Sequence, residues 1–422
     1  MHAEPKATPR TPLLPVDDAL ALLRERLRPL RTTERVALPD AARRVLAVDV
    51  RADRDQPDFD RSMMDGVAVR SVECAAAENR LRVVGESPAG APYAAAVEAG
   101  TAVRVMTGGV VPPGADAVVP VERTRSAEID GGVLAGATLI VEGPVHAEQH
   151  IARKGSEVVA GARVLAAGQR VDGARLGVLA SFGVARPEVV RRPRVGLLPT
   201  GDEIVRVDQQ PAPGQVRDSN RWSLAALLDA WGAEVMHGEV AVDRKDAVAD
   251  AVRHLAGLCD IVVLSGGVSM GDYDLVGGAL ASLGAEVVFH RVKMRPGKPV
   301  LCAFIGETLI LGLPGNPVSS VVAAHLFLRP ALCWLEGEAG AGWRSVAVPL
   351  TAPLHSNGPR EAFLPGRWVA TADGSLGVEP VRTAGSADLA GWADSDVLIR
   401  QAPLDPGAEA GASADVLVWT RR

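Results

Sequence analysis

Residues 260–274 read DIVVLSGGVSMGDYD, and residues 309–320 read LILGLPGNPVSS. Each stretch runs from a short apolar segment through a glycine-containing turn into a helical pattern, which is typical of a buried strand followed by a helix. Further apolar runs, VGLLP, AEVMHGEVAV and EVVFHRV, alternate with helical segments between residues 194 and 338. This alternation predicts a parallel sheet that is covered by helices on both faces.

The two turns are candidate anion-binding loops. In the first, Ser265, Gly266 and Gly267 end the strand, where free N–H groups and a helix dipole attract a negative charge. In the second, Asn316 is placed to cap the next helix and Pro317 to occupy its first position. Open α/β sheets bind ligands at such carboxyl ends of strands. Turns of this composition also occur for purely structural reasons, so each loop alone leaves both interpretations open.

Carboxylates follow the same strands. Asp202 and Glu203 come after VGLLP, Asp243 comes after AEVMHGEVAV, and Asp272 and Asp274 come after DIVVL. Mg²⁺ prefers oxygen ligands and usually takes one or two carboxylates together with substrate oxygens. The sequence therefore predicts a magnesium site at this edge of the sheet, although helix capping is an alternative, above all for Asp243.

A cationic loop and an acidic turn are further candidates. The segment VKMRPGKPV places Arg295 and Lys298 among prolines that stiffen the loop. Rigid cations suit an oxyanion or a phosphate, whereas an isolated run of charges more often forms a solvated turn. The turn SMMDG contains Asp65, and physical reasoning alone identifies only a carboxylate before a strand. Met63 and Met64 in this turn are interpreted as packing residues.

The composition excludes several classes of protein. The 422 residues include 45 basic and 51 acidic side chains, a formal charge of −6, which argues against broad nucleic-acid binding. Four cysteines without a C-x-x-C pair argue against a zinc or disulfide framework. No apolar segment follows the charged N-terminus, and charges and a proline interrupt the most apolar helical run, residues 318–335. We expect a cytoplasmic protein with neither a membrane nor a nucleic acid as partner.

Taken together and in order, the motifs resemble the molybdopterin molybdenumtransferases, the MoeA family to which the gephyrin E domain belongs. The matching stretches are PDFDRSMMDGVAVR, VMTGG with PPGADAVVP, HIARKGSEVVAGARVLAAG, LPTGDEIV, GQVRDSNRWSL, SGGVSMGDYD, MRPGKPV and LPGNPVSS. They belong to a likeness that runs from about residue 11 to the C-terminus. The SGG loop by itself also resembles the MogA-type molybdopterin adenylyltransferases.

The resemblance implies an α/β fold class with four parts. These are a MogA-like parallel-sheet domain with the active-site core (192–338), an elongated β-rich insertion (52–147), a mixed connecting domain (11–51 and 148–191) and a C-terminal β domain (339–422). Short β-rich runs between glycines and prolines in the insertion, and β segments near the C-terminus, agree with this division. The resemblance also implies a homodimer with a shared active cleft and transient contact with a MogA-type adenylyltransferase.

The implied reaction inserts molybdenum from molybdate into adenylylated molybdopterin, with Mg²⁺ and release of AMP. Carried over to this sequence, the catalytic positions are Asp65, Thr107, Glu203, Asp243 and Asp272. The substrate-binding positions are Ser265, Gly266, Gly267, Arg295, Lys298, Pro314, Pro317 and Arg360. The metal-binding positions are Asp202, Glu203, Asp243, Asp272 and Asp274. The chain departs from the family pattern at Met63, at Val67, at His150 (commonly Asn) and at Gly391 (in some members a molybdate-contacting serine).

Two other functions account for part of the same pattern. A MogA-type adenylyltransferase would explain the α/β segment but leaves about half of the chain without a role. A non-catalytic scaffold of the gephyrin kind is disfavoured, because a fused second enzyme domain and a long linker are both missing. Preference for tungstate over molybdate stays open, since the two oxyanions share charge and geometry.

Overall fold

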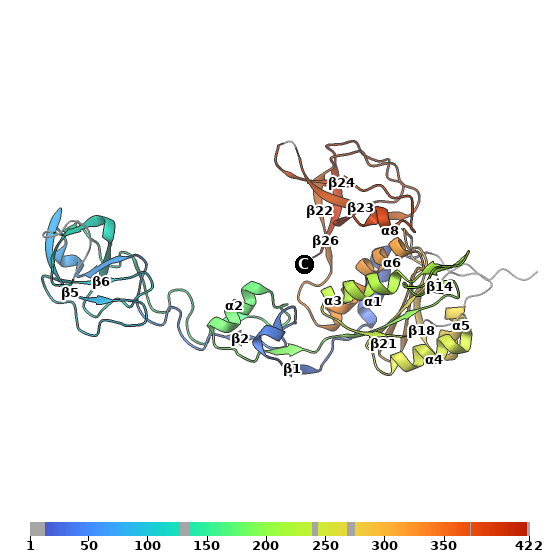
Figure 1. Cartoon of the computed structure of the whole chain (residues 1–422), viewed down its shortest axis with the longest axis horizontal. Helices are drawn as coiled ribbons and strands as arrows, with labels where there is room; N and C mark the ends of the chain where they lie inside the picture. The colour runs from blue at the N-terminus through green and yellow to red at the C-terminus, as the bar shows by residue number, and fades with distance from the viewer. Residues whose placement is uncertain (1–12, 127–134, 239–243, 268–274, 372, 420–422) are drawn as a thin grey trace, which may run out of the picture. The chain divides into compact units, whose positions relative to one another are not determined.

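The structure is a computed structural model that describes residues 13–126, 135–238, 244–267, 275–371 and 373–419. The chain folds into two compact units, whose elements are labelled in Figure 1. The first unit consists of residues 1–48, 167–176 and 186–422, and the second of residues 49–166 and 177–185. The second unit is therefore inserted into the chain of the first.

A six-stranded sheet with the order β16-β13-β17-β21-β20-β18 is the centre of the first unit. Its strands are β13 (Arg194–Pro199), β16 (Glu234–His237), β17 (Ile261–Ser265), β18 (Glu286–His290), β20 (Leu301–Ile305) and β21 (Thr308–Leu313). The pairs from β16 to β21 are parallel, whereas β20 is antiparallel to both of its neighbours. The predicted all-parallel sheet is wrong at β20, because a two-residue turn containing Gly306 folds this strand back on β21 as a hairpin.

Helices bury both faces of this sheet, as the nearly continuous apolar strands predicted. Side chains alternate between two cores: Val263 and Leu311 belong to the first, and Val262 and Ile310 to the second. The first core is closed by α1 (Val16–Arg26), α3 (Asn220–Ala230), α6 (Pro317–Ala323), the π-helical segment η4 (Ala324–Leu328) and α7 (Arg329–Leu335). The second is closed by α4 (Lys245–Ala256) and α5 (Leu275–Ser282), which lie together in Figure 1.

One described helical run, Pro317–Leu335, is long and apolar enough to cross a membrane by length and composition. Within the structure, however, 78% of its most apolar window is buried. Val322, Leu326 and Leu332 of this run belong to the first core. Its apolar character is therefore explained by packing inside the unit.

The C-terminal segment adds a second sheet with the order β19-β23-β25-β26-β22, and β24 pairs with β23. Its elements are β19 (Met294–Arg295), β22 (Trp343–Pro349), β23 (Glu361–Ala370), β24 (Leu376–Pro380), β25 (Val397–Gln401) and β26 (Ser413–Trp419), with α8 (Leu389–Trp392) before β25. Ile399 and Val416 lie in a core of this sheet alone, whereas Phe363 and Leu398 join the first core of the α/β sheet. The two sheets of the first unit thus share one apolar core.

Short elements complete the first unit. β1 (Thr33–Arg35) pairs with β12 (Glu188–Val190), and β14 (Ile204–Val205) pairs with β15 (Val216–Arg217). The 3₁₀ turn η1 (Leu38–Ala41) follows β1, and α2 (Gly173–Ser181) continues from the first unit into the second. Arg170 forms ion pairs with Glu338 and with Glu336, whose side chain is 1% exposed, so segment 167–176 is anchored just after α7.

The second unit is a β-rich module, as predicted for most of its length. Its main sheet has the order β7-β4-β6-β5-β9-β8. The strands are β4 (Gly66–Val69), β5 (Glu78–Ser87), β6 (Thr101–Val105), β7 (Ala117–Pro120), β8 (Thr124–Ser126) and β9 (Thr138–Glu142), with 3₁₀ turns η2 (Ser71–Glu73) and η3 (Val121–Arg123). The outgoing and returning chains run side by side where β2 (Val50–Arg51) pairs with β11 (Arg163–Leu165) and β3 (Arg61–Ser62) with β10 (Ile151–Ala152).

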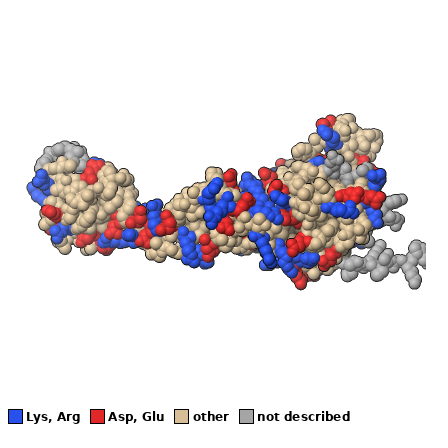
Figure 2. All heavy atoms as spheres, turned by 90° about the horizontal axis from the view of Figure 1, so that it is seen from below, with Lys and Arg blue, Asp and Glu red and all other residues tan. Residues whose placement is uncertain are grey.

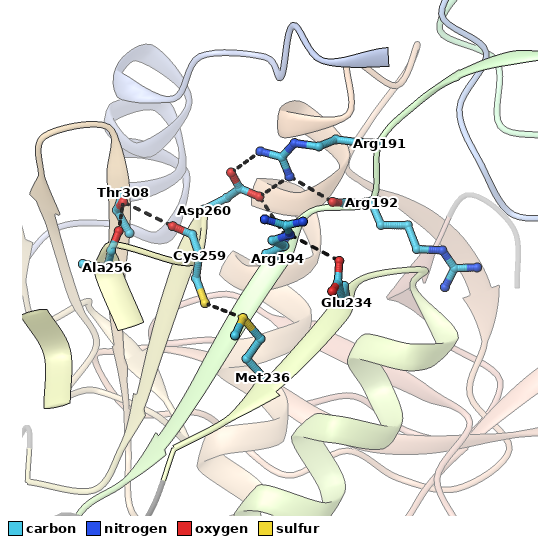
Figure 3. Close-up of polar contacts among 9 residues, drawn as sticks. All are labelled: Arg191, Arg192, Arg194, Glu234, Met236, Ala256, Cys259, Asp260 and Thr308. Carbon is cyan, nitrogen blue, oxygen red and sulfur yellow. Dashed lines mark hydrogen bonds and ion pairs between the residues drawn. The ribbon is translucent and has the colours of Figure 1, made fainter. Parts of the chain in front are cut away.

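A polar cluster fixes the amino ends of the α/β strands (Figure 3). Asp260, directly before β17, accepts hydrogen bonds from the Arg191 guanidinium at 2.7 and 2.6 Å and from the backbone N–H of Arg194 at 2.8 Å. The Arg194 side chain pairs in turn with Glu234 on β16, at 3.3 Å. Burial raises the pKa of the neighbouring Cys259 thiol to about 11, so this cysteine is protonated at neutral pH. The cluster ties three strand starts together at the edge opposite the predicted site.

We expect the substitution Asp260→Ala to lower the free energy of unfolding by about 1.5–3 kcal/mol. It leaves Arg191, whose side chain is 25% exposed, without its charged partner. Urea denaturation followed by tryptophan fluorescence measures the change. The matched control is Asp208→Ala, which breaks a pair with Arg206. The two side chains are 63% and 75% exposed, so the free energy of unfolding should barely change. Equal unfolding midpoints for the two variants would contradict the role of the cluster.

Both signs of charge are present on the face that Figure 2 presents. On the face that Figure 2 presents, basic side chains alternate with acidic ones instead of gathering in one broad basic area. This distribution matches the small formal charge of −6. It is unlike the continuous basic surface that polyanion binding requires.

Candidate active site

The carboxyl ends of β13 and β17 meet where the strand order of the α/β sheet reverses. From β13 the chain continues to β16 on one side, and it then returns to β17 on the other side of β13. The backbone N–H of Thr200, directly after β13, donates to the carbonyl of Ser265 at the end of β17, at 2.9 Å. Open α/β sheets bind ligands outside such a reversal, because the two connections diverge there and leave a crevice.

Two glycines turn the chain sharply after β17. Gly266 and Gly267 have φ angles of +99° and +66°, which glycine adopts without strain. A Cβ atom on Gly266 would lie 2.4 Å from the carbonyl oxygen of Thr200, and one on Gly267 would lie 2.8 Å from the Thr200 hydroxyl. A Cβ atom on Gly315, in the second loop, would lie 3.5 Å from Cα of Gly266. The two predicted loops are therefore in contact and leave no room for a side chain on the first.

Asn220 joins the two loops. Its Nδ2 donates to the Ser265 hydroxyl and to the carbonyl of Gly315, both at 2.8 Å. Asn220 is 9% exposed. Two buried oxygens, Oδ1 of Asn220 and the hydroxyl of Thr200, have no hydrogen-bond partner among the described residues. Buried polar groups of this kind call for a partner such as a bound ligand or water, and here both lie beside the loops.

Sequence analysis did not identify this role of Asn220. Helix α3 begins at Asn220, and the side chain of the preceding Ser219 makes no capping hydrogen bond. The carboxylate of Asp218 accepts the N–H of Arg221 at 3.1 Å instead. The place of Asn220 in the sequence could have indicated this role. The helix that follows β13 and its loop begins near the carboxyl ends of the neighbouring strands, so an amide at its start lies there too.

The second loop is held by the C-terminal segment. Pro314 is buried, and Pro317 occupies the first position of α6, as predicted. Asn316 precedes the helix but its side chain does not cap it; the amide donates to the hydroxyl of Ser386 at 2.9 Å. The prediction of a side-chain cap is therefore wrong: the oxygen of the amide accepts no N–H of the helix, and the side chain contacts Ser386 instead.

Two of the predicted metal ligands lie in the described part of the chain. Asp202 and Glu203 are exposed in the turn after β13. The Glu203 carboxylate lies over Gly201, on which a Cβ atom would be 2.6 Å from Oε2. Among the described residues, no three His, Cys, Asp or Glu side chains form a group that could hold a metal ion. The other predicted ligands lie outside the described residues: Asp243, Asp272 and Asp274.

Two predicted arginines from distant parts of the sequence meet at one buried amide. Arg295 on β19 donates from Nε to Oδ1 of Asn357 at 2.6 Å. Nδ2 of Asn357 donates to the carbonyl of Arg360 at 2.7 Å, and Nη1 of Arg360 donates to the carbonyl of Met294 at 3.4 Å. Asn357 is 7% exposed, so it is a fixed support for both arginines. Sequence reasoning did not identify Asn357.

The turn with Lys298 packs near the second loop. Gly297 has a φ angle of +98°, and a Cβ atom on it would lie 3.4 Å from the carbonyl oxygen of Ser319 in α6. Lys298 follows at an exposed position. The basic turn and the helix after the second loop are thus neighbours within the first unit.

In the second unit, two predicted site residues form a pair of their own. Oδ1 of Asp65 accepts the backbone N–H of Thr107 at 2.6 Å and the Thr107 hydroxyl at 2.8 Å. These two hydrogen bonds hold the pKa of the Asp65 carboxyl below its usual value, so it is ionised at neutral pH. Met63 and Met64 in the same turn are 56% and 37% exposed, so their interpretation as packing residues is wrong.

Comparison with known proteins identifies the family. The family models named "MoeA N-terminal region (domain I and II)", "Probable molybdopterin binding domain" and "MoeA C-terminal region (domain IV)" match residues 14–183, 196–334 and 347–419. A molybdopterin molybdenumtransferase from Nostoc is 37% identical over 375 residues, which cover 86% of this chain and 84% of the relative. The chain belongs to the MoeA family.

Two further proteins agree with MoeA membership. A molybdopterin molybdenumtransferase from Bacillus subtilis is 34% identical over 414 residues, which cover 97% of this chain and 94% of the relative. The crystal structure of the molybdopterin biosynthesis moeA protein from Pyrococcus horikoshii covers 97% of this chain and 100% of its own, with 26% identity and a TM-score of 0.82. The predicted resemblance and the α/β multi-domain fold class are confirmed.

Two of the departures from the MoeA pattern, Gly391 and His150, have a local explanation. The N–H of Gly391 donates to Asp388 at 2.9 Å, and a Cβ atom on Gly391 would lie 2.5 Å from the Asp388 carboxylate, so a serine there would not fit without a shift. His150 has a φ angle of +57°, a conformation in which both histidine and asparagine are enriched. Val67 is fully buried in a core of the second unit.

Proposed function

We propose that this chain inserts molybdenum from molybdate into adenylylated molybdopterin and releases AMP. The observation that carries the proposal is that the first unit contains two elements suited to anions. These are the glycine loops joined by Asn220, and the pair Arg295 and Arg360 held at Asn357. A substrate with a phosphoanhydride suits the loops, and a tetrahedral oxyanion suits the guanidinium groups. Relatives named molybdopterin molybdenumtransferase support the same reaction.

The residues of the glycine loops would bind the phosphates of the substrate. Backbone N–H groups of a loop without side chains can approach phosphate oxygens closely. The Thr200 hydroxyl and the Asn220 amide oxygen are buried next to this loop and would complete the hydrogen bonding of the bound substrate or its water. Attack of a water molecule on the phosphoanhydride would release AMP and leave the phosphate on the pterin. The two pterin thiols would then bind molybdenum, their two protons leaving with one molybdate oxygen as water, so no protein nucleophile is required.

The basic residues would bind molybdate. Arg295, Arg360 and Lys298 are basic side chains, and a guanidinium presents paired donors to the oxygens of an oxyanion. Asn357 would fix the direction of the Arg295 guanidinium through the hydrogen bond at 2.6 Å. Preorganised donors of this kind stabilise charge without rearranging during the reaction.

We propose Mg²⁺ as the metal cofactor. The described members of the predicted ligand set fit it chemically, since Asp202 and Glu203 are exposed carboxylates directly after β13, and Mg²⁺ takes carboxylates together with phosphate oxygens. When bound, the ion supplies charge neutralisation at the phosphoanhydride. The ligand set proposed is Asp202, Glu203, Asp243, Asp272 and Asp274.

We further propose that the active form is a cytoplasmic homodimer whose cleft is shared between subunits. The pair of Asp65 and Thr107 supports the shared cleft. Its ionised carboxylate orders an exposed loop in the second unit, whereas the glycine loops belong to the first unit.

Contact with a MogA-type adenylyltransferase would be transient. The proposed domains are 11–51 with 148–191, 52–147, 192–338 and 339–422. Light scattering that shows only a monomer at micromolar concentration would contradict the dimer.

Incubation with adenylylated molybdopterin, molybdate and Mg²⁺ tests the reaction by following AMP release. We expect release to require Mg²⁺, and Asp243→Asn and Asp272→Asn, which keep shape but remove charge, to slow it by at least about tenfold. The control Asp208→Asn changes an exposed carboxylate outside the predicted ligand set and should leave the rate unchanged. Wild-type rates in both site variants would contradict the metal site, and absence of AMP release from the wild-type protein would contradict the reaction.

A further inference from the structure

The first unit contains a cavity of about 740 Å³, which none of the predicted site residues that the structure describes lines. Its walls come from residues 169–175, the end of α3, η4 and α7, the start of β22 and residues 392–398. A cavity of this size is typical of sites for small organic molecules. We propose that it binds a small aromatic anion, a molecule with a planar ring and one phosphate or carboxylate group.

The lining side chains leave an excess of positive charge. Two of the five lining arginines, Arg170 and Arg175, are already paired with acidic side chains. Arg43 and Arg344 are exposed, and within the described ranges neither forms an ion pair with a carboxylate. The lining also contains Asp396, whose carboxylate accepts the backbone N–H of Trp368 at 3.1 Å. The five lining arginines still outnumber the three lining acids, Asp172, Glu338 and Asp396. Two guanidinium groups are thus available to an anionic group of a ligand.

The remaining arginine, Arg329, places a charge on the helical wall. Burial is the main cause that lowers the pKa of its guanidinium, which still stays protonated at neutral pH. Burial and, second, the charge of Arg329 lower the pKa of His325 to about 3, so that ring is neutral at pH 7. The surroundings of both groups therefore disfavour positive charge. An anion bound in the cavity would stabilise the charge of Arg329.

Two indole rings favour an aromatic ligand over an inorganic anion. Trp231 packs edge-on against the ring of His325, with 5.3 Å between ring centroids, and the Arg329 guanidinium lies 5.8 Å from the Trp231 centroid. Trp392 and Leu332 add apolar surface to the lining. A planar ring can cover these surfaces while its acidic group pairs with arginine, whereas phosphate alone would leave them in contact with water.

AMP is the probe, because it carries a planar base and a phosphate, with adenosine and inorganic phosphate as comparators. Titration calorimetry on the full chain with Asn220→Ala and Gly266→Ala avoids the proposed active site, because these changes disrupt the glycine loops that would hold a phosphate there. We expect one equivalent of AMP to bind, and adenosine and inorganic phosphate each to bind at least about tenfold more weakly.

When Arg43→Ala and Arg344→Ala are added to this first variant, AMP binding should weaken by at least about tenfold. Both side chains are exposed, so the fold should persist, which the urea midpoint checks. The control Arg367→Ala removes an exposed arginine outside the cavity and should change nothing. The proposal is overturned if AMP does not bind in the first background, if phosphate binds as well as AMP, or if Arg43 and Arg344 have no effect. The titration does not depend on molybdenum insertion, so the two proposals can fail separately.

Discussion

Alanine in place of Arg295 or Arg360 is expected to raise the molybdate concentration for half-maximal AMP release more than about tenfold. A guanidinium stays charged at physiological pH and offers paired donors to a tetrahedral oxyanion. Both arginines are held at one buried amide, Asn357, so each substitution removes one charge-assisted contact worth about 1.5–3 kcal/mol. Titration of molybdate in the AMP-release assay measures the shift.

Binding of adenylylated molybdopterin should change much less in these variants, because the glycine loops hold its phosphates. The matched control Arg367→Ala removes an arginine of the same C-terminal sheet that pairs with Glu379 at 2.7 Å, and it should leave the molybdate dependence unchanged. Calorimetric titration of both substrates separates the two effects. An unchanged molybdate dependence in both variants, or an equal loss for the two substrates, would show that these arginines do not serve molybdate.

The substitution Gly266→Ala is expected to slow AMP release by about 100-fold while the chain stays folded. Alanine at a φ angle of +99° is strained by about 1–3 kcal/mol. Its methyl group would also lie 2.4 Å from the carbonyl oxygen of Thr200, so the loop has to move. A displacement of about 1 Å in a group that positions a substrate can cost about 100-fold in rate.

The control Gly284→Ala separates strain from displacement. Gly284 has a φ angle of +68°, and nothing lies within 4 Å of an added Cβ atom, so alanine there is strained without a clash. We expect its rate to equal that of the wild type. Asn220→Ala loosens the same loop without backbone strain and should slow AMP release in the same direction. A wild-type rate for Gly266→Ala would place the reacting phosphates elsewhere.

Most of the α/β sheet could be predicted because its pattern lies in neighbouring residues. The strand Ile261–Ser265 is fully apolar apart from its last residue, and a glycine turn follows it. The strand Leu301–Ile305 escaped this reasoning, since alternation of strands and helices favours a helix before the next strand. Its signal was a two-residue turn with glycine between two apolar runs, which is a hairpin pattern.

From the residues alone, the candidate site could be predicted only at positions where the backbone conformation itself requires a particular residue type. The glycines after β17 do so, because the close approach to Thr200 excludes a Cβ atom. Asn220 does not, since its two partners lie 45 and 95 residues away and an asparagine at that place is equally suited to a cap. The same holds for Asp65, whose partner Thr107 follows 42 residues later.

Helix α1 is synthesised long before the charged residues that pair with its two ends. Arg26 at its end pairs with Glu286, which is 260 residues further on. Asp17 at its start pairs with Arg400, 383 residues further on. At about 5–20 residues per second, a ribosome needs roughly 10–50 s to pass from α1 to the strand with Glu286. The second unit is made in this interval, so during synthesis the apolar face of α1 stays without the later strands and helices that cover it in the folded chain.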